Sequence, residues 1–409
     1  MSDAAPLTVQ VAADEAGLSG AARTYFDRLR AGDMGSLPVI VGMALITIYF
    51  TLKVDVFFTA QNFDDLIPQL AGTALIAIGV VFVLLIGEID LSVGILSGLC
   101  GVCVAWFASP ETGHTVPGLV AIALAICFGA LIGMLQGSIV ALLGVPSFVV
   151  TLAGLLAFQG VIIKWIGQNA TIGIQDQYIN DMASYFFSKN AGWIIATGIS
   201  VVFAGTVAAG ARSRVRHGLP VGNVPLLVIR TGFVAAITFL FVAISNHARG
   251  VSFAGMLVIA MIAVGTFVAR RTTFGRHVYA VGGNAEAARR AGINVPFIRI
   301  AVFMISGAMA AMGGIMFASR LQGVALSAGG GSTLLDAIAA AVIGGTSLFG
   351  GRGRVIGALL GAVVIGTIAN GLALIGSDAS TQFIVTGLIL LAAVTLDTLS
   401  RRKLVASGR

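Results

Sequence analysis

The stretch from Leu66 to Phe107 reads LIPQLAGTALIAIGVVFVLLIGEIDLSVGILSGLCGVCVAWF, and it decides which fold the chain can adopt. It is almost entirely apolar, and Glu88 and Asp90 interrupt it near its centre. An apolar run of about 20 residues crosses the ~30 Å hydrocarbon layer of a bilayer as a helix. The stretch therefore predicts two membrane-spanning helices that meet at the acidic interruption.

The composition of the whole chain agrees with this prediction. Of the 409 residues, 57% are hydrophobic and 10% are charged, and the mean hydropathy is +1.00. A soluble domain carries roughly 25% charged residues, so an ordinary soluble protein is excluded. We predict an all-α, polytopic transmembrane helical bundle of about twelve spans. The spans begin near Leu37, Leu66, Leu91, Pro117, Pro146, Gly192, Val224, Val251, Phe297, Leu334, Val355 and Gln382.

Lysine and arginine predict the orientation of the bundle, because cytoplasmic loops retain these residues preferentially. With both termini in the cytoplasm, about nineteen of the 24 basic residues lie in or beside cytoplasmic segments. The net charge of +7 is therefore a signal of topology, and we expect no nucleic-acid binding. The predicted organisation is a cytoplasmic leader (1–36), a transmembrane domain (37–400) with a large cytoplasmic loop (270–296), and a cytoplasmic tail (401–409).

Glu88 and Asp90 would be unfavourable facing lipid, so we expect them at a helix break that faces water or protein. Asp90 can cap a helix that starts at Leu91 by accepting its free amide hydrogens, with Ser92 in the first turn. Three interpretations stay open here: a capped cytoplasmic turn, a discontinuous helix that lines or gates a pathway, and a proton-coupling carboxylate.

A faint internal repeat accompanies this break. Residues 86–99, IGEIDLSVGILSGL, align with residues 343–359, IGGTSLFGGRGRVIGAL, with a small insertion. Repeated halves with broken helices are common in transporters. Asp336 lies ahead of the second stretch, in the first turn of a helix that Ser332 or Thr333 can cap. Capping is the simpler role of Asp336, and lining of a pathway is the alternative.

The 54 glycines include two trios at four-residue spacing, which places each trio on one face of a helix. Small residues let transmembrane backbones approach closely. We therefore predict close helix packing along two faces, which are Gly129, Gly133 and Gly137, and Gly353, Gly357 and Gly361.

Motifs of enzymes and of metal sites are missing from the sequence. Neither an HExxH metal motif nor a GxSxG nucleophile motif occurs, and the four histidines are scattered. No lysine follows a glycine, so the phosphate loop of ATPases is absent as well. We expect no catalytic residue, no metal site and no cofactor bound by this chain, and any ATP that drives it must bind another polypeptide.

The segment 270–296, RRTTFGRHVYAVGGNAEAARRAGINVP, is a polar interruption between two long apolar runs. Residues 286–291 are rich in alanine and precede Gly292, which predicts a short helix with a glycine stop. Such an exposed helix has too little apolar surface to enter lipid, yet its small side chains fit a groove on a partner protein. A merely solvated loop is the alternative.

The sequence resembles the ribose/xylose/galactose class of ABC-importer permeases from about Leu66 to Arg402. The chain's length and the additional stretch near 167–245 favour the xylose permeases within this class. Five sequence blocks carry the resemblance, in the order expected of the family: GEIDLSVG (87–94), GVPSFVVTLAGLLAFQGV (144–161), GGNAEAARRAGINV (282–295), LDAIAAAVIGGTSLFGG (335–351) and GALLGA (357–362).

This resemblance implies the transmembrane subunit of a sugar importer in a bacterial inner membrane. The implied partners are a second permease copy, a cytoplasmic ATPase that binds ATP and Mg, a periplasmic sugar-binding protein, and membrane lipid. D-xylose is the expected sugar, and ribose, galactose, arabinose and inositol stay open. The implied ATPase contacts are Asn284, Glu286, Ala287, Ala288, Arg289 and Gly292.

The translocation pathway is expected to include the acidic signature of the family and a few polar or aromatic residues. These residues are Glu88, Asp90, Ser92, Phe148, Gln159 and Asp336. The competing hypothesis is a proton-coupled secondary sugar transporter, in which Glu88 or Asp90 is the protonatable site.

Overall fold

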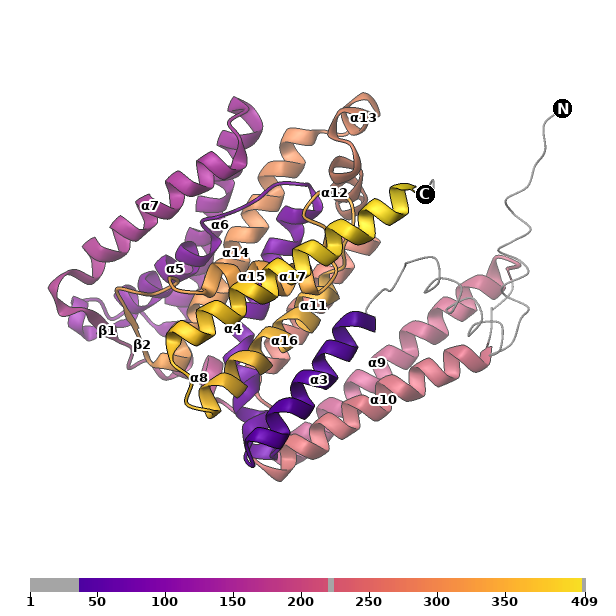
Figure 1. Ribbon diagram of the computed structural model, residues 1–409, viewed down its shortest axis with the longest axis horizontal. Helices are drawn as coiled ribbons and strands as arrows, with labels where there is room; N and C mark the ends of the chain where they lie inside the picture. Colours follow the sequence, from indigo (N-terminus) through magenta and orange to yellow (C-terminus); the bar gives the residue numbers. More distant parts are fainter. Residues whose placement is uncertain (1–36, 220–223, 407–409) are drawn as a thin grey trace. The chain divides into compact units, whose positions relative to one another are not determined.

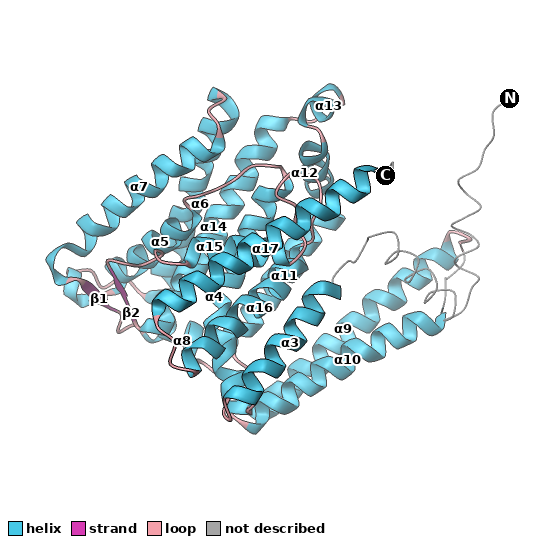
Figure 2. Cartoon of the chain, in the orientation of Figure 1, coloured by secondary structure: helices cyan, strands magenta, loops and turns pink. Residues whose placement is uncertain are grey.

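The computed structural model describes residues 37–219 and 224–406, and these residues are helical nearly throughout (Figure 2). The predicted leader, 1–36, lies outside the described residues. Clustering of contacts divides the chain into two units. The smaller unit contains two long antiparallel helices between Phe187 and Val251, and the larger unit contains Ser36–Phe186 and Ser252–Leu399.

Helices begin within a few residues of every predicted start, which confirms the all-α prediction. The apolar helices are α3 (Leu37–Lys53), α4 (Ala60–Leu85), α5 (Val93–Ala108), α6 (Gly118–Leu143), α7 (Ser147–Ile166), α9 (Lys189–Arg216), α10 (Val224–His247), α11 (Phe253–Arg271), α14 (Val295–Leu321), α15 (Thr333–Ile343), α16 (Val355–Leu374) and α17 (Ala379–Ala406). The last of these continues six residues past the expected domain end at 400.

Eight of the described helices are long and apolar enough to cross a membrane: α4, α6, α7, α9, α10, α11, α14 and α16. The other four have shorter apolar stretches, that of α17 being Ala379–Ala392, and α15 has 11 residues in all. At 1.5 Å per residue α15 is about 16 Å long, roughly half the thickness of the hydrocarbon layer. The multi-span architecture is therefore clear, while the number of twelve spans and the orientation of the termini stay predictions.

The polar segment 270–296 contains two helices rather than the single expected one. They are α12 (Thr273–Gly283) and α13 (Ala285–Arg290). The sequence does carry a signal for α12, because Phe274, Val278 and Val281 recur at helical spacing and the last two are buried. The polar residues between them hid this amphipathic pattern.

The centre of the larger unit is formed by α4, α5 and α14. Helix α14 packs along α6, α4 and α5, and α4 is 83% buried over its most apolar window. The outer faces of α3, α6 and α7 instead expose large apolar side chains, such as Leu45, Leu135 and Leu156. Apolar side chains on an outer surface are the arrangement that lipid contact requires.

Two ends of the larger unit are distinguishable in Figure 1. Helices α12 and α13 lie at one end, and α8 (Gln177–Ser184) lies toward the other with the strands β1 (Thr171–Gly173) and β2 (Gly323–Ala325). The strands pair antiparallel, with Ile172 opposite Val324. Short 3-10 turns at Pro110–Thr112 and Gly167–Asn169 complete the connections.

The first glycine trio lies where α6 crosses α14, as predicted. A side-chain carbon on Gly129 would collide with the backbone oxygen of Gly307, and one on Gly133 would collide with that of Phe303. In the second trio, Gly357 and Gly361 of α16 face the backbone of α15 in the same way. Gly353 does not belong to this face, because α16 begins only at Val355 and Gly353 has a φ of 154°.

The α6–α14 contact predicts that a glycine-to-alanine change destabilises the protein at one helical position and not at another. Gly133→Ala places a methyl group against the backbone of α14 and should lower the free energy of unfolding by about 1–3 kcal/mol. Gly160→Ala on α7 is the matched control, because nothing lies within 4 Å of its added carbon. Thermal unfolding in detergent measures both, and equal stability of the two variants would contradict this packing.

Candidate functional site

The acidic interruption forms a discontinuous helix. Helix α4 ends at Leu85, and α5 begins at Val93 with Ser92 as its N-cap residue. The helix thus starts two residues after the expected Leu91, and Asp90 accepts the backbone amide of Ser92 just before the first turn. Asp90 lies two residues before the N-cap residue, and the side chain of Ser92 makes no capping hydrogen bond.

Asp90 is buried and serves as the acceptor of a small polar network. Its Oδ1 accepts hydrogen bonds from the backbone nitrogen of Ser92 at 2.9 Å and from Ser92 Oγ at 2.7 Å. Its Oδ2 accepts from Ser306 Oγ of α14 at 3.4 Å. The Ser92 hydroxyl in turn accepts from Gln136 Nε2 of α6 at 3.0 Å. The carboxylate therefore joins three helices inside the bundle.

The backbone of the interruption is satisfied by side chains of α7. The amide of Ile89 donates to Ser147 Oγ at 3.4 Å, and the amide of Leu91 donates to Thr151 Oγ1 at 3.1 Å. Non-helical backbone at membrane depth is tolerated only where its polar groups find partners in the protein. These contacts explain how the chain can leave the helical conformation here while the backbone amides of Ile89 and Leu91 keep hydrogen-bond partners.

Glu88 occupies a different environment from Asp90. Its carboxylate pairs with the guanidinium of Arg299 on α14 at 3.1 Å, and both side chains are partly exposed. The two acidic residues of the interruption thus have different structural roles. Glu88 links the break to the start of α14, and Asp90 organises the interior.

The second break, between α15 and α16, packs against the first. The backbone nitrogen of Gly351 donates to the oxygen of Leu85 at 2.9 Å, and Gly350 approaches Gly87 closely. The beginning of α5 meets the beginning of α15, because Gly94 contacts Gly329 and Leu334. The two aligned stretches therefore share a helix–break–helix form and touch each other.

Asp336 lies in the first turn of α15, as expected, with Ser332 at the N-cap position. The predicted capping bond is absent there, because Ser332 Oγ donates to Asp336 Oδ2 at 2.7 Å instead of accepting from the helix. The carboxylate of Asp336 thus fixes the side chain of Ser332, the residue directly before α15, by accepting its hydroxyl hydrogen.

A cavity of about 230 Å³ lies beside the start of α15, and we call it the α14–α15 cavity. Its polar lining comes from Arg320, Ser327 and Thr333, and Phe317 contributes an aromatic ring. The volume is below the ~300–1,000 Å³ of pockets for drug-sized ligands, so it suits a smaller solute. The remaining lining residues are Gly98, Gly101, Gly314, Leu321, Gly323, Val324, Ala325, Ala328 and Gly329.

Sequence reasoning missed this cavity, because none of the six predicted pathway residues is in its lining. Phe148, at the start of α7, is 54% exposed on the apolar surface. Gln159 donates from Nε2 to the oxygen of Leu326 at 3.2 Å, which ties α7 to the loop after β2. The glycines around residue 329 marked the cavity wall in the sequence, but their partners Gly98 and Gly101 are more than 200 residues away.

The other candidate site is the exposed helix α13. Asn284 caps it by accepting from the amide of Ala287 at 2.9 Å, and Glu286 pairs with Arg289 and Arg290. Gly292 follows with a φ of 85°, which confirms the predicted glycine stop. Ala288 is buried, so its side chain anchors the helix to the bundle while Ala287 faces outward.

Helix α12 is tied to the second break by Tyr279. Its hydroxyl donates to the backbone oxygen of Gly353 at 2.9 Å. Burial raises the pKa of Tyr279, and the nearby charges of Arg270 and Arg354 oppose this shift in part. The phenol is therefore protonated near neutral pH and keeps its role as a donor.

The polar network predicts a structural cost for removal of Asp90. Asp90→Ala leaves the hydroxyl groups of Ser92 and Ser306 without their acceptor, so the free energy of unfolding should fall by about 1–3 kcal/mol. Asp90→Asn keeps an acceptor oxygen and should lose less. Asp55→Ala, at an exposed turn, is the control. Denaturation in detergent would contradict the network if Asp90→Ala matched that control.

Comparison with known proteins places the chain in a family. It matches the family described as "Branched-chain amino acid transport system / permease component" over residues 62–394. It is 37% identical to the xylose transport system permease protein XylH of Escherichia coli (strain K12) over 383 residues, which are 92% of this chain and 95% of that protein. The XylH protein of Haemophilus influenzae is also 37% identical, over 92% of this chain and 100% of that protein.

A ribose permease shows nearly the same likeness. The ribose import permease protein RbsC of Escherichia coli (strain K12) is 34% identical over 92% of this chain and 96% of that protein. No solved structure matches the chain. The broken helices, the multi-span bundle and these full-length likenesses agree, and the chain belongs to this family of membrane transport permeases.

Proposed function

We propose that this protein is the membrane subunit of an ATP-driven importer for a monosaccharide, with D-xylose as its substrate. The observation that carries the proposal is the likeness to xylose and ribose permeases over 92% of the chain. The higher identity, 37% against 34%, favours xylose over ribose. The chain's own chemistry supports transport without catalysis, because sequence motifs for ATP binding and hydrolysis are missing.

The partners in this proposal each have a place on the chain. A cytoplasmic ATPase, which holds ATP and Mg, docks on α13, and a periplasmic binding protein delivers sugar at the opposite end. A second copy of the permease completes the transporter in the bacterial inner membrane, with both termini in the cytoplasm. Exposed Glu286, Ala287 and Arg289 support docking at α13, since they offer small and charged groups to a groove.

The coupling step follows from how α13 is attached. The preceding helix α12 connects α13 to both breaks, because Tyr279 bonds to Gly353 and Gly282 packs against Leu85 and Gly351. A movement of α13 that accompanies closure of the ATPase is therefore passed to the helices around the α14–α15 cavity. Coupling of this kind needs differential contacts in two states, which the ATPase supplies.

The α14–α15 cavity is the proposed waypoint for the sugar. Hydroxyl and guanidinium groups of Ser327, Thr333 and Arg320 can hydrogen-bond sugar hydroxyls, and Phe317 offers an apolar face. Of the residues expected in the pathway, Asp336 lies in the same helix as Thr333 and Asp90 supports the facing start of α5. Glu88 and Ser92 then stabilise the break, and Phe148 and Gln159 are left with supporting roles.

Proton-coupled transport is the second candidate, because Asp90 is a buried carboxylate. Both oxygens of Asp90 accept hydrogen bonds from Ser92 and Ser306, which gives this carboxyl group a structural role in the break. Proteoliposomes with a proton gradient and no nucleotide separate the two: sugar uptake there would establish proton coupling. Under our proposal, Asp90→Asn retains ATP-driven uptake.

Docking at α13 predicts a selective loss. Ala287→Trp adds a large side chain on the exposed face of α13, so it should remove ATPase co-purification and lower ATP-driven xylose uptake at least about tenfold. Ser213→Trp, at the exposed end of α9, is the matched control and should keep both. Membrane insertion is checked by protease accessibility, and normal uptake in Ala287→Trp would argue against docking here.

The proposed waypoint predicts a different phenotype. Ser327→Phe fills part of the α14–α15 cavity, so xylose uptake should fall severalfold while the ATPase still co-purifies. Ser380→Phe, at the exposed start of α17, is the control and should transport normally. Radiolabelled uptake in the reconstituted complex measures both, and unimpaired transport by Ser327→Phe would remove this cavity from the pathway.

A further inference from the structure

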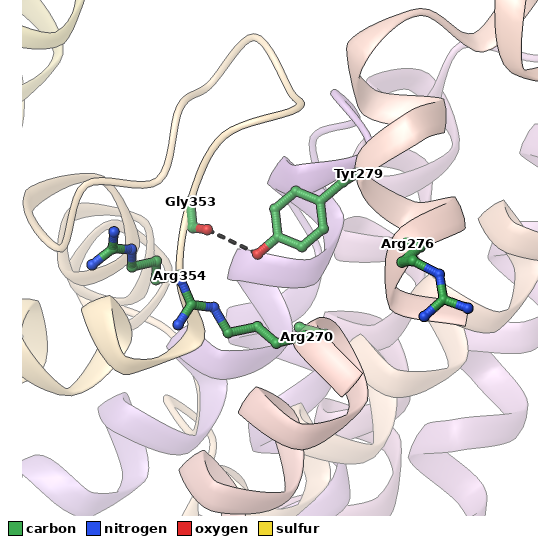
Figure 3. Close-up of a pocket in the computed structure, with 6 residues that line it drawn as sticks. Arg270, Arg276, Tyr279, Gly353 and Arg354 are labelled. Atoms are coloured by element: carbon green, nitrogen blue, oxygen red, sulfur yellow. Dashed lines mark hydrogen bonds between the residues drawn. The ribbon is translucent and has the colours of Figure 1, made fainter. Parts of the chain in front are cut away.

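An open pocket of about 460 Å³ lies where α11, α12 and the start of α16 meet (Figure 3). We call it the arginine pocket, and its lining consists of Ala269, Arg270, Arg276, Tyr279, Gly353 and Arg354. Arg270 is the penultimate residue of α11, and Arg354 directly precedes α16. Three arginines from separate parts of the sequence thus line one opening, and Arg270 and Arg354 lie on the same side of it.

The lining carries positive charge without a carboxylate to balance it. Among residues 37–219 and 224–406, Arg289 and Arg290 pair with Glu286, and Arg299 pairs with Glu88. None of these pairs reaches the arginine pocket. In Figure 3, Arg270 and Arg354 lie beside each other below Tyr279, whereas Arg276 lies on the far side of Tyr279 with its guanidinium turned away from them. Like charges held this close favour an anion between them.

The backbone of the pocket also favours an anion. Arg354 is the N-cap residue of α16, and its side chain makes no capping hydrogen bond. The first amide groups of a helix carry partial positive charge and point outward along the helix axis. Tyr279 fixes the backbone of this corner by its bond to Gly353, the residue directly before Arg354.

The position of the pocket identifies the source of the anion. Arg270 and Arg354 end or precede two candidate membrane spans, Phe253–Arg271 and Val355–Leu374. Just inside these ends, Phe267 is 61% exposed and Ile356 is 42% exposed. A free phosphate cannot cover these exposed apolar side chains, whereas a phospholipid bound by its head group covers them with its acyl chains. Basic pockets between spans at the membrane border are the setting in which anionic head groups bind.

We propose that the arginine pocket binds the phosphate group of an anionic phospholipid at the membrane border beside α12 and α13. Guanidinium forks match phosphate oxygens in geometry as well as charge. The bound lipid neutralises Arg270 and Arg354 and bridges α11 to α16. Because Tyr279 joins the same corner to α12, an occupied pocket stiffens the base of the exposed helix α13.

The test compares the affinity of purified protein for anionic lipid between two charge-matched double variants. The pocket variant is Arg270→Gln with Arg354→Gln, and the control is Arg214→Gln with Arg216→Gln at the end of α9. Titration with phosphatidylglycerol in detergent, read by intrinsic fluorescence or native mass spectrometry, should give a dissociation constant at least about tenfold higher for the pocket variant alone. Phosphatidylcholine should bind neither.

Several outcomes would overturn the proposal. Equal weakening in both double variants would mean general attraction to the charged surface. Inorganic phosphate that competes as strongly as phosphatidylglycerol would assign the pocket to a free anion. Unchanged lipid binding together with loss of the ATPase would assign the arginines to a protein partner. The single variant Arg354→Gln gives a second measure, and the lipid-free melting temperature confirms that each variant is folded.

Discussion

The fold depends on a backbone contact between two places where helices are interrupted. The amide of Gly351 bonds to the oxygen of Leu85, and Gly87 and Gly350 lie against each other with no side chain between them. In a bilayer an interrupted helix must satisfy its free polar groups within the protein. Each break here does so partly through the other, with help from Ser147 and Thr151 of α7. Either break without the other would leave backbone polar groups without hydrogen-bond partners inside the membrane.

From this contact follows the placement of both candidate sites. Helix α5 starts inside the bundle, against Gly329 and Leu334, so the α14–α15 cavity opens beside the two helix starts. Helices α12 and α13 lie at the end where the two breaks meet, because Gly282 packs on Leu85 and Gly351. Helix α12, which precedes the exposed helix α13, thus packs on both interruptions, whereas the cavity lies beside the starts of α5 and α15.

The sequence predicted elements whose signals are local. Twelve apolar helices, the stop at Gly292 and the α6–α14 glycine face all follow from composition or spacing within one segment. It failed where a partner is distant: the capping prediction for Asp90 could not include Ser306, 216 residues away. The cavity was missed for the same reason, because its walls come from α5, α14 and the loop before α15. Contacts between small residues that are far apart in the chain do not change the hydrophobic periodicity of either segment, so the sequence pattern does not reveal them.

The small β1–β2 ladder ties together two connections that are 150 residues apart in the chain. Three residue pairs from Thr171–Ala325 to Gly173–Gly323 join them, and Gln159 holds the same strap through Leu326. The strap forms one rim of the α14–α15 cavity, since β2 lies in its lining. Neither connection can therefore move by itself. To widen the cavity at this rim, the two strands must move together as one rigid body, or the hydrogen bonds between them must break.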